Sequence, residues 1–165
     1  MADERALRSF LDITRTVRAT SEVLRPVKPA SPQHGARMID HTGVIVSNFA
    51  LSKKFYRLAL QPIGYHLVAD IPASVTGHTD VAGFGENGKP DFWISAGQPN
   101  RPAIHVAFRV DSREKVDSFY SEAIAAGATC NGKPGLRSHY HPNYYGAFVL
   151  DPDGHNIEAV CHAPQ

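Results

Sequence analysis

Two stretches decide the fold, Ile39–Val46 (IDHTGVIV) and Ala103–Val110 (AIHVAFRV). Both are apolar and contain β-branched residues, a composition typical of buried β-strands. Each contains a histidine, His41 in the first and His105 in the second, and the two histidines stand 64 residues apart. Self-similarity at a fixed offset indicates two copies of one structural unit.

A pair of aromatic residues repeats at the same offset, Phe55-Tyr56 in the first half and Phe119-Tyr120 in the second. Each pair lies on a segment whose apolar residues recur at helical spacing, and Leu51 and Ile124 are expected on the inward faces. Asn48 can cap the first of these helices.

The second helix begins in a segment that resembles a capping box, with Asp111 in the capping position, and Gly127 ends it. Further strands are expected at 65–68, 81–84 and 92–95 in the first half and at 128–130, 145–150 and 156–160 in the second. The sequence therefore predicts an α+β fold of two tandem βαβββ modules, 38–98 and 103–162.

Composition excludes several classes of protein. The chain has 165 residues with 42% hydrophobic and 20% charged residues, which fits a soluble globular domain. The net charge of +1 gives no general affinity for nucleic acid or for an anionic membrane, and no apolar run could span a bilayer. The two cysteines, Cys130 and Cys161, have no metal-type spacing, and we expect a cytoplasmic protein in which Cys161 is buried and inert.

Residues 1–37 differ from the rest of the chain. They carry seven basic and four acidic residues, with apolar residues at roughly helical spacing up to Leu24. Pro26, Pro29 and Pro32 then form a stiff linker. We expect a helical extension ahead of a domain at 38–165. A mitochondrial presequence is the alternative, which the four acidic residues disfavour.

One carboxylate stands in an unusual place. Glu158 lies in the middle of the last expected strand, between apolar Ile157 and Ala159. A carboxylate there is costly unless it is paired or bound to a metal. Glu158 follows His105 by 53 residues and Trp93 follows His41 by 52, so the repeat places an indole where the second module has the carboxylate.

These residues resemble a known family. Met38-Ile39-Asp40-His41, His105-Val106-Ala107-Phe108 and above all Asp151-Pro152-Asp153-Gly154-His155-Asn156-Ile157-Glu158 are similar to the pattern of the vicinal-oxygen-chelate superfamily of glyoxalases, bleomycin-resistance proteins and extradiol dioxygenases. The resemblance implies a curved, open mixed sheet around one cleft for a small molecule. It further implies that His41, His105 and Glu158 bind a divalent metal and that Glu158 is catalytic.

The resemblance leaves the reaction open. Trp93 departs from the four-ligand glyoxalase arrangement, and three ligands resemble the extradiol dioxygenases more closely. Two imidazoles and one carboxylate suit Fe, Mn, Zn or Ni and leave coordination positions for substrate oxygens. We expect a metal-dependent lyase, isomerase or dioxygenase acting on a small oxygen-bearing substrate. The alternative function is a metal-free protein of the bleomycin-resistance type that binds or sequesters a small molecule. For assembly, the chain could form a homodimer.

Side chains for the substrate are expected from two places. Trp93, Phe84 and Phe108 could wall an apolar pocket, although sheet packing explains them equally well. The segment 137–145 could form a lid that brings His139 and Tyr145 over the pocket, or it could be a polar surface loop. His155 is expected to be structural.

Overall fold

The computed structural model describes residues 39–164, so the helix expected within residues 1–37 lies outside the described residues. Within residues 39–164, no helix has the length and apolar character needed to cross a membrane. The first half contains β1 (Thr42–Val46), α2 (Phe49–Ala59), a 3-10 turn η2 (Gln61–Ile63), β2 (His66–Ile71), α3 (Ala73–Thr76), β3 (Val81–Glu86) and β4 (Lys89–Ala96).

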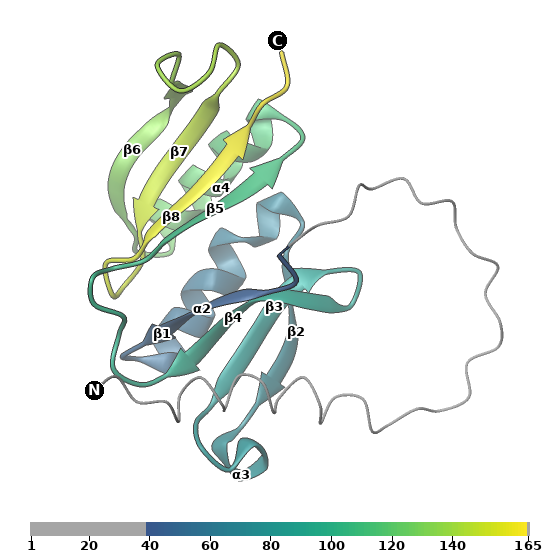
Figure 1. The fold of residues 1–165 in the computed structure, drawn as a ribbon, viewed down its shortest axis with the longest axis vertical. Helices are drawn as coiled ribbons and strands as arrows, with labels where there is room; N and C mark the ends of the chain where they lie inside the picture. The colour runs from purple at the N-terminus through teal and green to yellow at the C-terminus, as the bar shows by residue number, and fades with distance from the viewer. Residues whose placement is uncertain (1–38, 165) are drawn as a thin grey trace, which may run out of the picture.

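The second half repeats this order without counterparts of η2 and α3 (Figure 1). It contains β5 (His105–Val110), α4 (Arg113–Ala125), β6 (Thr129–Leu136), β7 (Tyr145–Leu150) and β8 (Asn156–Cys161). Strand β6 runs well beyond the expected residues 128–130. Its Gly and Pro residues signal a turn, but pairing with β7 across irregular registers carries the strand through them. The predicted α+β fold of two tandem βαβββ modules is confirmed.

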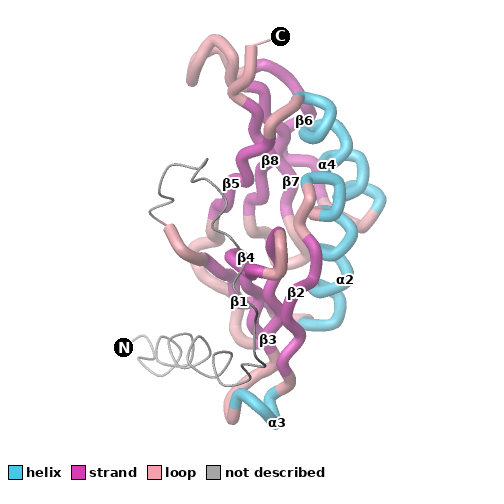
Figure 2. The backbone as a smooth tube through the Cα atoms, turned by 90° about the vertical axis from the view of Figure 1, so that its right-hand side faces the viewer, coloured by secondary structure: helices cyan, strands magenta, loops and turns pink. Residues whose placement is uncertain are grey.

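Each module forms one four-stranded sheet, in the orders β1-β4-β3-β2 and β5-β8-β7-β6. The first and last strands of a module pair in parallel and the other neighbours are antiparallel, so both sheets are mixed. Helices α2 and α4 lie on the same side of the two sheets (Figure 2). The opposite side of each sheet is called its helix-free face below.

The core lies between the sheets and these helices. The fully buried rings of Phe55, Tyr56, Phe84, Phe92 and Phe119 dominate it. These are the apolar residues that alternation along strands and helical spacing place on the inner faces.

Two helix predictions need correction. The N-cap of α4 is Ser112, whose hydroxyl accepts from the Lys115 amide, and not Asp111, which pairs with the Lys115 ammonium instead. Leu51 and Ile124 are exposed, because they lie at the edges of apolar stripes that are narrower than helical spacing alone suggests. The capping of α2 by Asn48 is confirmed.

The turn between β7 and β8, residues 151–155, joins the two modules. Asp153 accepts from the amide and hydroxyl of Ser47, at 2.9 and 2.5 Å, at the end of β1. Asp151 is buried and accepts from the Tyr56 hydroxyl on α2 at 2.7 Å. This inter-module turn therefore reaches both a strand and a helix of the first module.

His155 and Asn100 complete the free edge of β1. The amide of Ile45 donates to Asn100 Oδ1 at 2.8 Å, and the carbonyl of Ile45 lies 3.2 Å from His155 Nε2. The other ring nitrogen of His155 accepts from the Ile104 amide at 3.1 Å, so Nε2 carries the proton. Two side chains thus take the place of a neighbouring strand, and the structural role expected for fully buried His155 is confirmed.

Candidate functional site

Alternation along β8 separates its side chains. Ile157 and Ala159 face α4 in the core, so Glu158 between them points to the helix-free face. His105 shares that face, because it pairs with Asn156, two residues before Glu158. Glu158 is only 1% exposed, so its carboxylate must be satisfied by neighbours.

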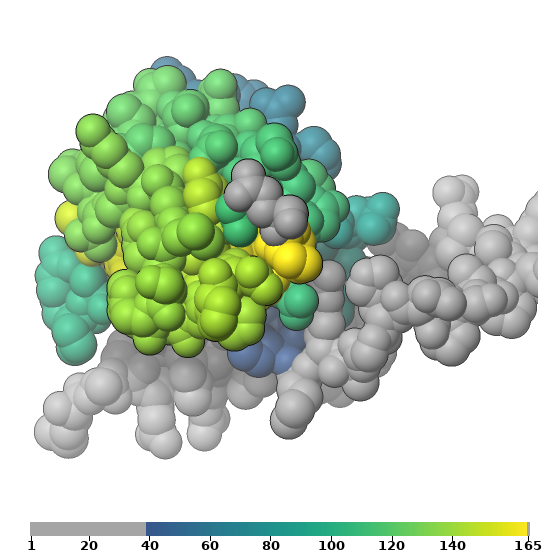
Figure 3. All heavy atoms as spheres, turned by 90° about the horizontal axis from the view of Figure 1, so that it is seen from above, coloured from purple at the N-terminus to yellow at the C-terminus, as the bar shows by residue number. Residues whose placement is uncertain are grey.

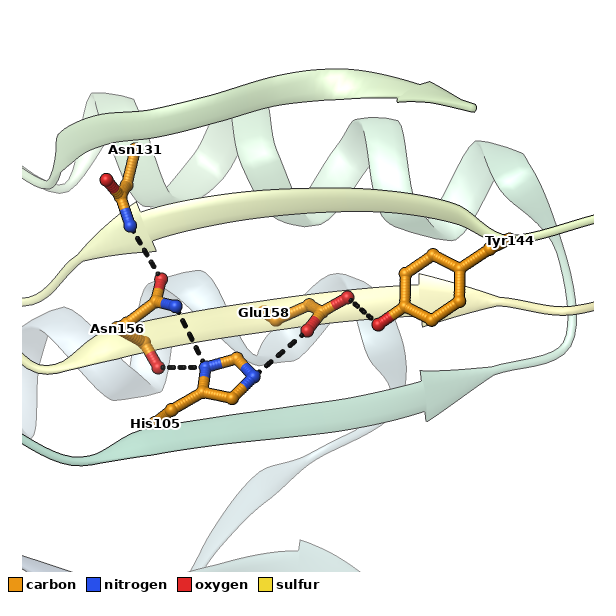
Figure 4. A network of polar contacts seen from close by, with 5 residues as sticks. All are labelled: His105, Asn131, Tyr144, Asn156 and Glu158. Atoms are coloured by element: carbon orange, nitrogen blue, oxygen red, sulfur yellow. Dashed lines mark hydrogen bonds and ion pairs between the residues drawn. The ribbon is translucent and has the colours of Figure 1, made fainter. Parts of the chain in front are cut away.

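Both oxygens of Glu158 have partners (Figure 4). Oε2 lies 3.2 Å from His105 Nε2, and Oε1 accepts from the Tyr144 hydroxyl at 2.6 Å. Burial, followed by the hydrogen bond to Glu158, raises the pKa of Tyr144 well above its usual value, so the phenol stays a neutral donor. A Cβ at position 146 would lie 3.0 Å from Oε1, so Gly146 leaves the room in which the two side chains meet.

The His105 ring is held on its other sides. It stacks on the ring of Phe148, with 6.4 Å between the ring centroids. The guanidinium carbon of Arg137 lies 5.5 Å from the centroid of the Phe148 ring. Its Nδ1 lies 3.1 Å from the carbonyl oxygen of Asn156 and 2.9 Å from the side-chain nitrogen of the same residue. The ring is thereby oriented with Nε2 toward Glu158.

Aromatic rings surround Tyr144 at the end of the β7–β8 pair. Tyr144 lies 5.1 Å from Tyr140 and 5.1 Å from His162, and His141 lies 5.9 Å from His162, measured between ring centroids. Seen from above, the segment between β6 and β7 (yellow-green) lies beside the C-terminal end of the chain (yellow) (Figure 3). These rings form one cluster, from which the Tyr144 hydroxyl reaches the carboxylate.

A groove of about 1300 Å³ runs between the modules beside this pair. Residues of both modules line it. They include His41, Tyr65 and Asp91 from the first module and His105, Phe108, Arg109, Lys115 and His162 from the second. Apolar walls and charges of both signs suit a small molecule with polar groups.

His41 lines the same groove but contacts other groups. Its Nδ1 lies 3.1 Å from the carboxylate of Asp40, which also pairs with Lys89 at 2.6 Å. The hydrogen bond from Lys89, followed by that from His41, lowers the pKa of Asp40. Among residues 39–164, no three His, Cys, Asp or Glu side chains lie close enough together to hold a metal ion. The structure therefore brings His105 and Glu158 together and holds His41 across the groove.

Trp93 occupies the position in the first module that Glu158 has in the second. Trp93 pairs with Gly43, Glu158 pairs with Ala107, and the partners stand 64 residues apart. Its neighbours Phe92 and Ile94 are in the core, so the indole points to the helix-free face. The indole lies over Gly83, where a Cβ would come within 3.0 Å of the ring.

The other expected substrate residues are scattered. Phe108 lines the groove and contacts Phe92 and Tyr65, at 5.3 and 5.2 Å between centroids. Phe84 is fully buried in the helix-facing core and does not line the groove. His139 is exposed beside Tyr140.

Tyr145, expected above the pocket, turns to the opposite side. Its hydroxyl donates to Asp117 on α4 at 2.8 Å, and the Arg113 guanidinium lies over its ring. The neighbouring Tyr144 is the one that reaches Glu158. The bounds of β7 were predicted correctly, but alternation puts Tyr145 on the same face as buried Ala147 and Val149, so its side chain lies on the helix side of the sheet.

Sequence reasoning missed Tyr144 and Asn156 as site residues. The signal for Asn156 was available, since a residue two positions before Glu158 lies on the same face of the strand. No local pattern marks Tyr144, which precedes β7 and whose contact depends on how residues 137–144 fold.

The donor pair fits a divalent cation. Two atoms that bind one cation at about 2.0–2.2 Å each lie about 3–3.4 Å apart in tetrahedral or octahedral coordination. His105 Nε2 and Glu158 Oε2 lie 3.2 Å apart. A buried carboxylate beside an oriented imidazole is also the donor chemistry that Fe, Mn, Zn and Ni prefer.

Solved structures share this fold. A glyoxalase/bleomycin resistance protein from Albidiferax ferrireducens is 28% identical with a TM-score of 0.61, over 77% of this chain and 100% of that one. A fosfomycin resistance protein, FosX, from Listeria monocytogenes, solved with Mn(II) and a dihydroxypropylphosphonic acid, is 18% identical with a TM-score of 0.56, over 79% and 95%. A glyoxalase I from Zea mays is 20% identical with a TM-score of 0.57, over 74% and 46%.

The sequence itself matches a family model. A search of curated proteins found no match. The model of the Glyoxalase/Bleomycin resistance protein/Dioxygenase superfamily matches residues 38–159, which contain the first module, nearly all of the second, the Glu158–His105 pair and the inter-module turn. The chain therefore belongs to the glyoxalase/bleomycin resistance protein/dioxygenase superfamily.

Proposed function

We propose that this protein is a divalent-metal-dependent enzyme of the glyoxalase or dioxygenase type, acting on a small oxygen-bearing substrate in the groove between the modules. The observation that carries the proposal is the buried carboxylate of Glu158, whose Oε2 lies 3.2 Å from His105 Nε2. A buried acid held beside an imidazole on a helix-free face has no evident packing role. Two proteins of the same fold support it, a glyoxalase I from Zea mays and a fosfomycin resistance protein, FosX, solved with Mn(II).

His105, Glu158 and His41 are the proposed ligands, with Glu158 also the proposed catalytic residue. His41 is proposed because it holds the place in the first module that His105 holds in the second, and because it lines the same groove. The bound metal, Fe, Mn, Zn or Ni, would act as a Lewis acid on substrate oxygens or bring O₂ and substrate together.

The remaining residues would bind and shield the substrate. Phe108 and Tyr65 form an apolar wall of the groove, and Arg109 and Lys115 bring positive charge for substrate oxygens. Tyr144 keeps Oε1 of Glu158 hydrogen-bonded and thereby fixes the plane of the carboxylate. Trp93 is a proposed substrate contact from the first module, on the helix-free face and not among the residues that line the groove.

Metal titration of purified protein tests the proposal. We expect the wild type to bind Zn(II) or Mn(II). Glu158→Gln should lose more affinity than the about 10–100-fold that loss of a ligand's hydrogen-bond partner costs, because the amide keeps the shape and removes the charge. Glu86→Gln is the matched control, since Glu86 is an exposed carboxylate that lines the same groove. Activity is then assayed against glyoxal adducts and catechols with each metal. Equal affinities in Glu158→Gln and wild type would show that Glu158 is not a ligand, and a wild type that binds neither metal would favour a metal-free binding protein.

A mixing experiment tests where His41 acts. His41→Ala and Glu158→Gln each remove one proposed ligand. If the ligands come from one chain, mixing the two variants restores no metal binding. If a homodimer shares its sites between chains, mixing restores intact sites in the mixed dimers. If His41→Ala alone binds metal as the wild type does, His41 is not a ligand.

A further inference from the structure

Strand β5 carries a row of exposed side chains on its helix-free face. His105, Ala107 and Arg109 share that face, whereas Phe108 and Val110 point to the core on the other side. Both His105 and Arg109 line the groove between the modules. The row therefore begins at the proposed metal site and ends at a guanidinium.

The strand pairing places Arg109 close to Glu158. Glu158 pairs with Ala107, and Arg109 stands two residues further along β5 on the same face. A rise of about 3.3 Å per residue and a strand spacing of about 4.8 Å put the Cα atoms of Arg109 and Glu158 roughly 8 Å apart. The side chain of Ala107 ends at Cβ and leaves room for a ligand between His105 and Arg109. One small molecule can therefore contact both ends of the row.

The guanidinium of Arg109 has no counter-charge in the protein. Among residues 39–164, Arg109 has no hydrogen bond or ion pair. Its direct neighbour on β8 is apolar Val160, and Asp111 is bonded to Lys115 at 3.0 Å instead. A guanidinium stays charged and presents N–H donors in a planar fork that matches the oxygens of a carboxylate or a phosphate. An oxyanion is thus the partner that Arg109 lacks.

We propose that Arg109 binds an anionic group of the substrate, a carboxylate, phosphonate or phosphate, so that the substrate of this groove is a small acid. The metal-binding oxygens of that acid lie at the Glu158–His105 pair, and its anionic group lies a few atoms away, beyond Ala107. The position of the oxygens rests on the proposed function, whereas the contact of Arg109 with an anion needs no metal. A neutral substrate would leave the guanidinium unpaired.

Two matched pairs of probes test whether the groove prefers an acid. Protocatechuate and catechol share two vicinal hydroxyls and differ by a carboxylate, and α-glycerol phosphate and glycerol differ by a phosphate. Calorimetry measures the binding of each probe to the full chain, without metal and with Zn(II). We expect the wild type to bind at least one acid about tenfold more tightly than its neutral partner, as a hydrogen bond to a charged group allows. The pair that responds distinguishes carboxylate from phosphate. If neither acid is preferred, the proposal is overturned.

Substitutions test whether Arg109 is the residue responsible. Arg109→Gln removes the charge and should abolish the preference, and Arg109→Lys should retain part of it, because lysine keeps the charge without the fork. Arg57→Gln is the matched control, since it removes the same charge from an exposed position of α2 that does not line the groove. The control should bind the acids as the wild type does. Equal losses in Arg109→Gln and Arg57→Gln would show a general charge effect and overturn the proposal.

Metal titration separates this inference from the proposed function. A wild type that prefers an acid but binds neither Zn(II) nor Mn(II) defeats the proposed function alone. A wild type that binds a metal without preferring either acid defeats the role of Arg109 alone.

Discussion

Tyr56→Phe tests whether the inter-module turn stabilises the domain. The substitution removes the hydroxyl that donates to the buried carboxylate of Asp151 at 2.7 Å and leaves the ring in place. Asp151 would keep its bonds from the amides of Asp153 and His155. A hydrogen bond to a charged group contributes about 1.5–3 kcal/mol to the free energy of unfolding. We expect a loss in that range, which lowers Tm by about 5–12 °C in a domain of this size.

Urea denaturation followed by circular dichroism measures the loss. Tyr145→Phe is the control, because it removes a hydroxyl bonded at 2.8 Å to the exposed carboxylate of Asp117 and should cost about 0.5 kcal/mol or less. If Tyr56→Phe is as stable as the control, the hydrogen bond between Tyr56 and Asp151 does not stabilise the contact between the modules.

The same variant predicts a pH dependence. Burial, followed by the charge of Asp151, raises the pKa of Tyr56 well above its usual value. In the folded state the phenol therefore keeps its proton at a pH where the unfolded chain releases it. The resulting stability is present below the unfolded pKa of about 10 and is lost as the pH rises from there toward the folded value. Stability measured from pH 8 to 11 should fall more steeply in the wild type than in Tyr56→Phe.

Three further predictions concern the site and the boundaries of the domain. Gly83→Ala should displace the indole of Trp93, the only tryptophan, because a Cβ at position 83 would lie 3.0 Å from the ring. The fluorescence of Trp93 should then shift to the red, and an unchanged spectrum would contradict this packing. Tyr144→Phe should destabilise the metal-free protein by about 1–3 kcal/mol, because it leaves an oxygen of Glu158 unpaired, and urea denaturation without and with Zn(II) measures the loss and its recovery. Deletion of residues 1–37 should leave a folded domain by circular dichroism, and a melted product would move the domain boundary.

Sequence patterns predicted the symmetric part of the molecule. The repeat placed Trp93 and Glu158 at equivalent positions although they stand 65 residues apart, and the strand pairing bears this out, because their partners Gly43 and Ala107 stand 64 residues apart. Such patterns predict correctly because, when one face of a strand is buried, every second residue must be apolar and the face of each side chain can be read from the sequence. The contact of Tyr144 with Glu158 has no such basis, since it depends on the conformation of a loop and on the space beside Gly146.

The motif near the end of the chain explains why the Glu158–His105 pair lies in the second module. Residues 151–155 bond to β1 and α2 of the first module, and β8 then begins at once with Asn156. Glu158 therefore stands on a strand whose start is fixed against both modules, three residues after buried His155. The first module has no counterpart of this arrangement at Trp93, because β3 and β4 are joined by a short exposed turn at Asn87-Gly88. The carboxylate of Glu158 contacts groups from two other segments, so it requires a strand whose position is fixed by contacts with both modules. The indole of Trp93 only packs over Gly83 and has no such requirement.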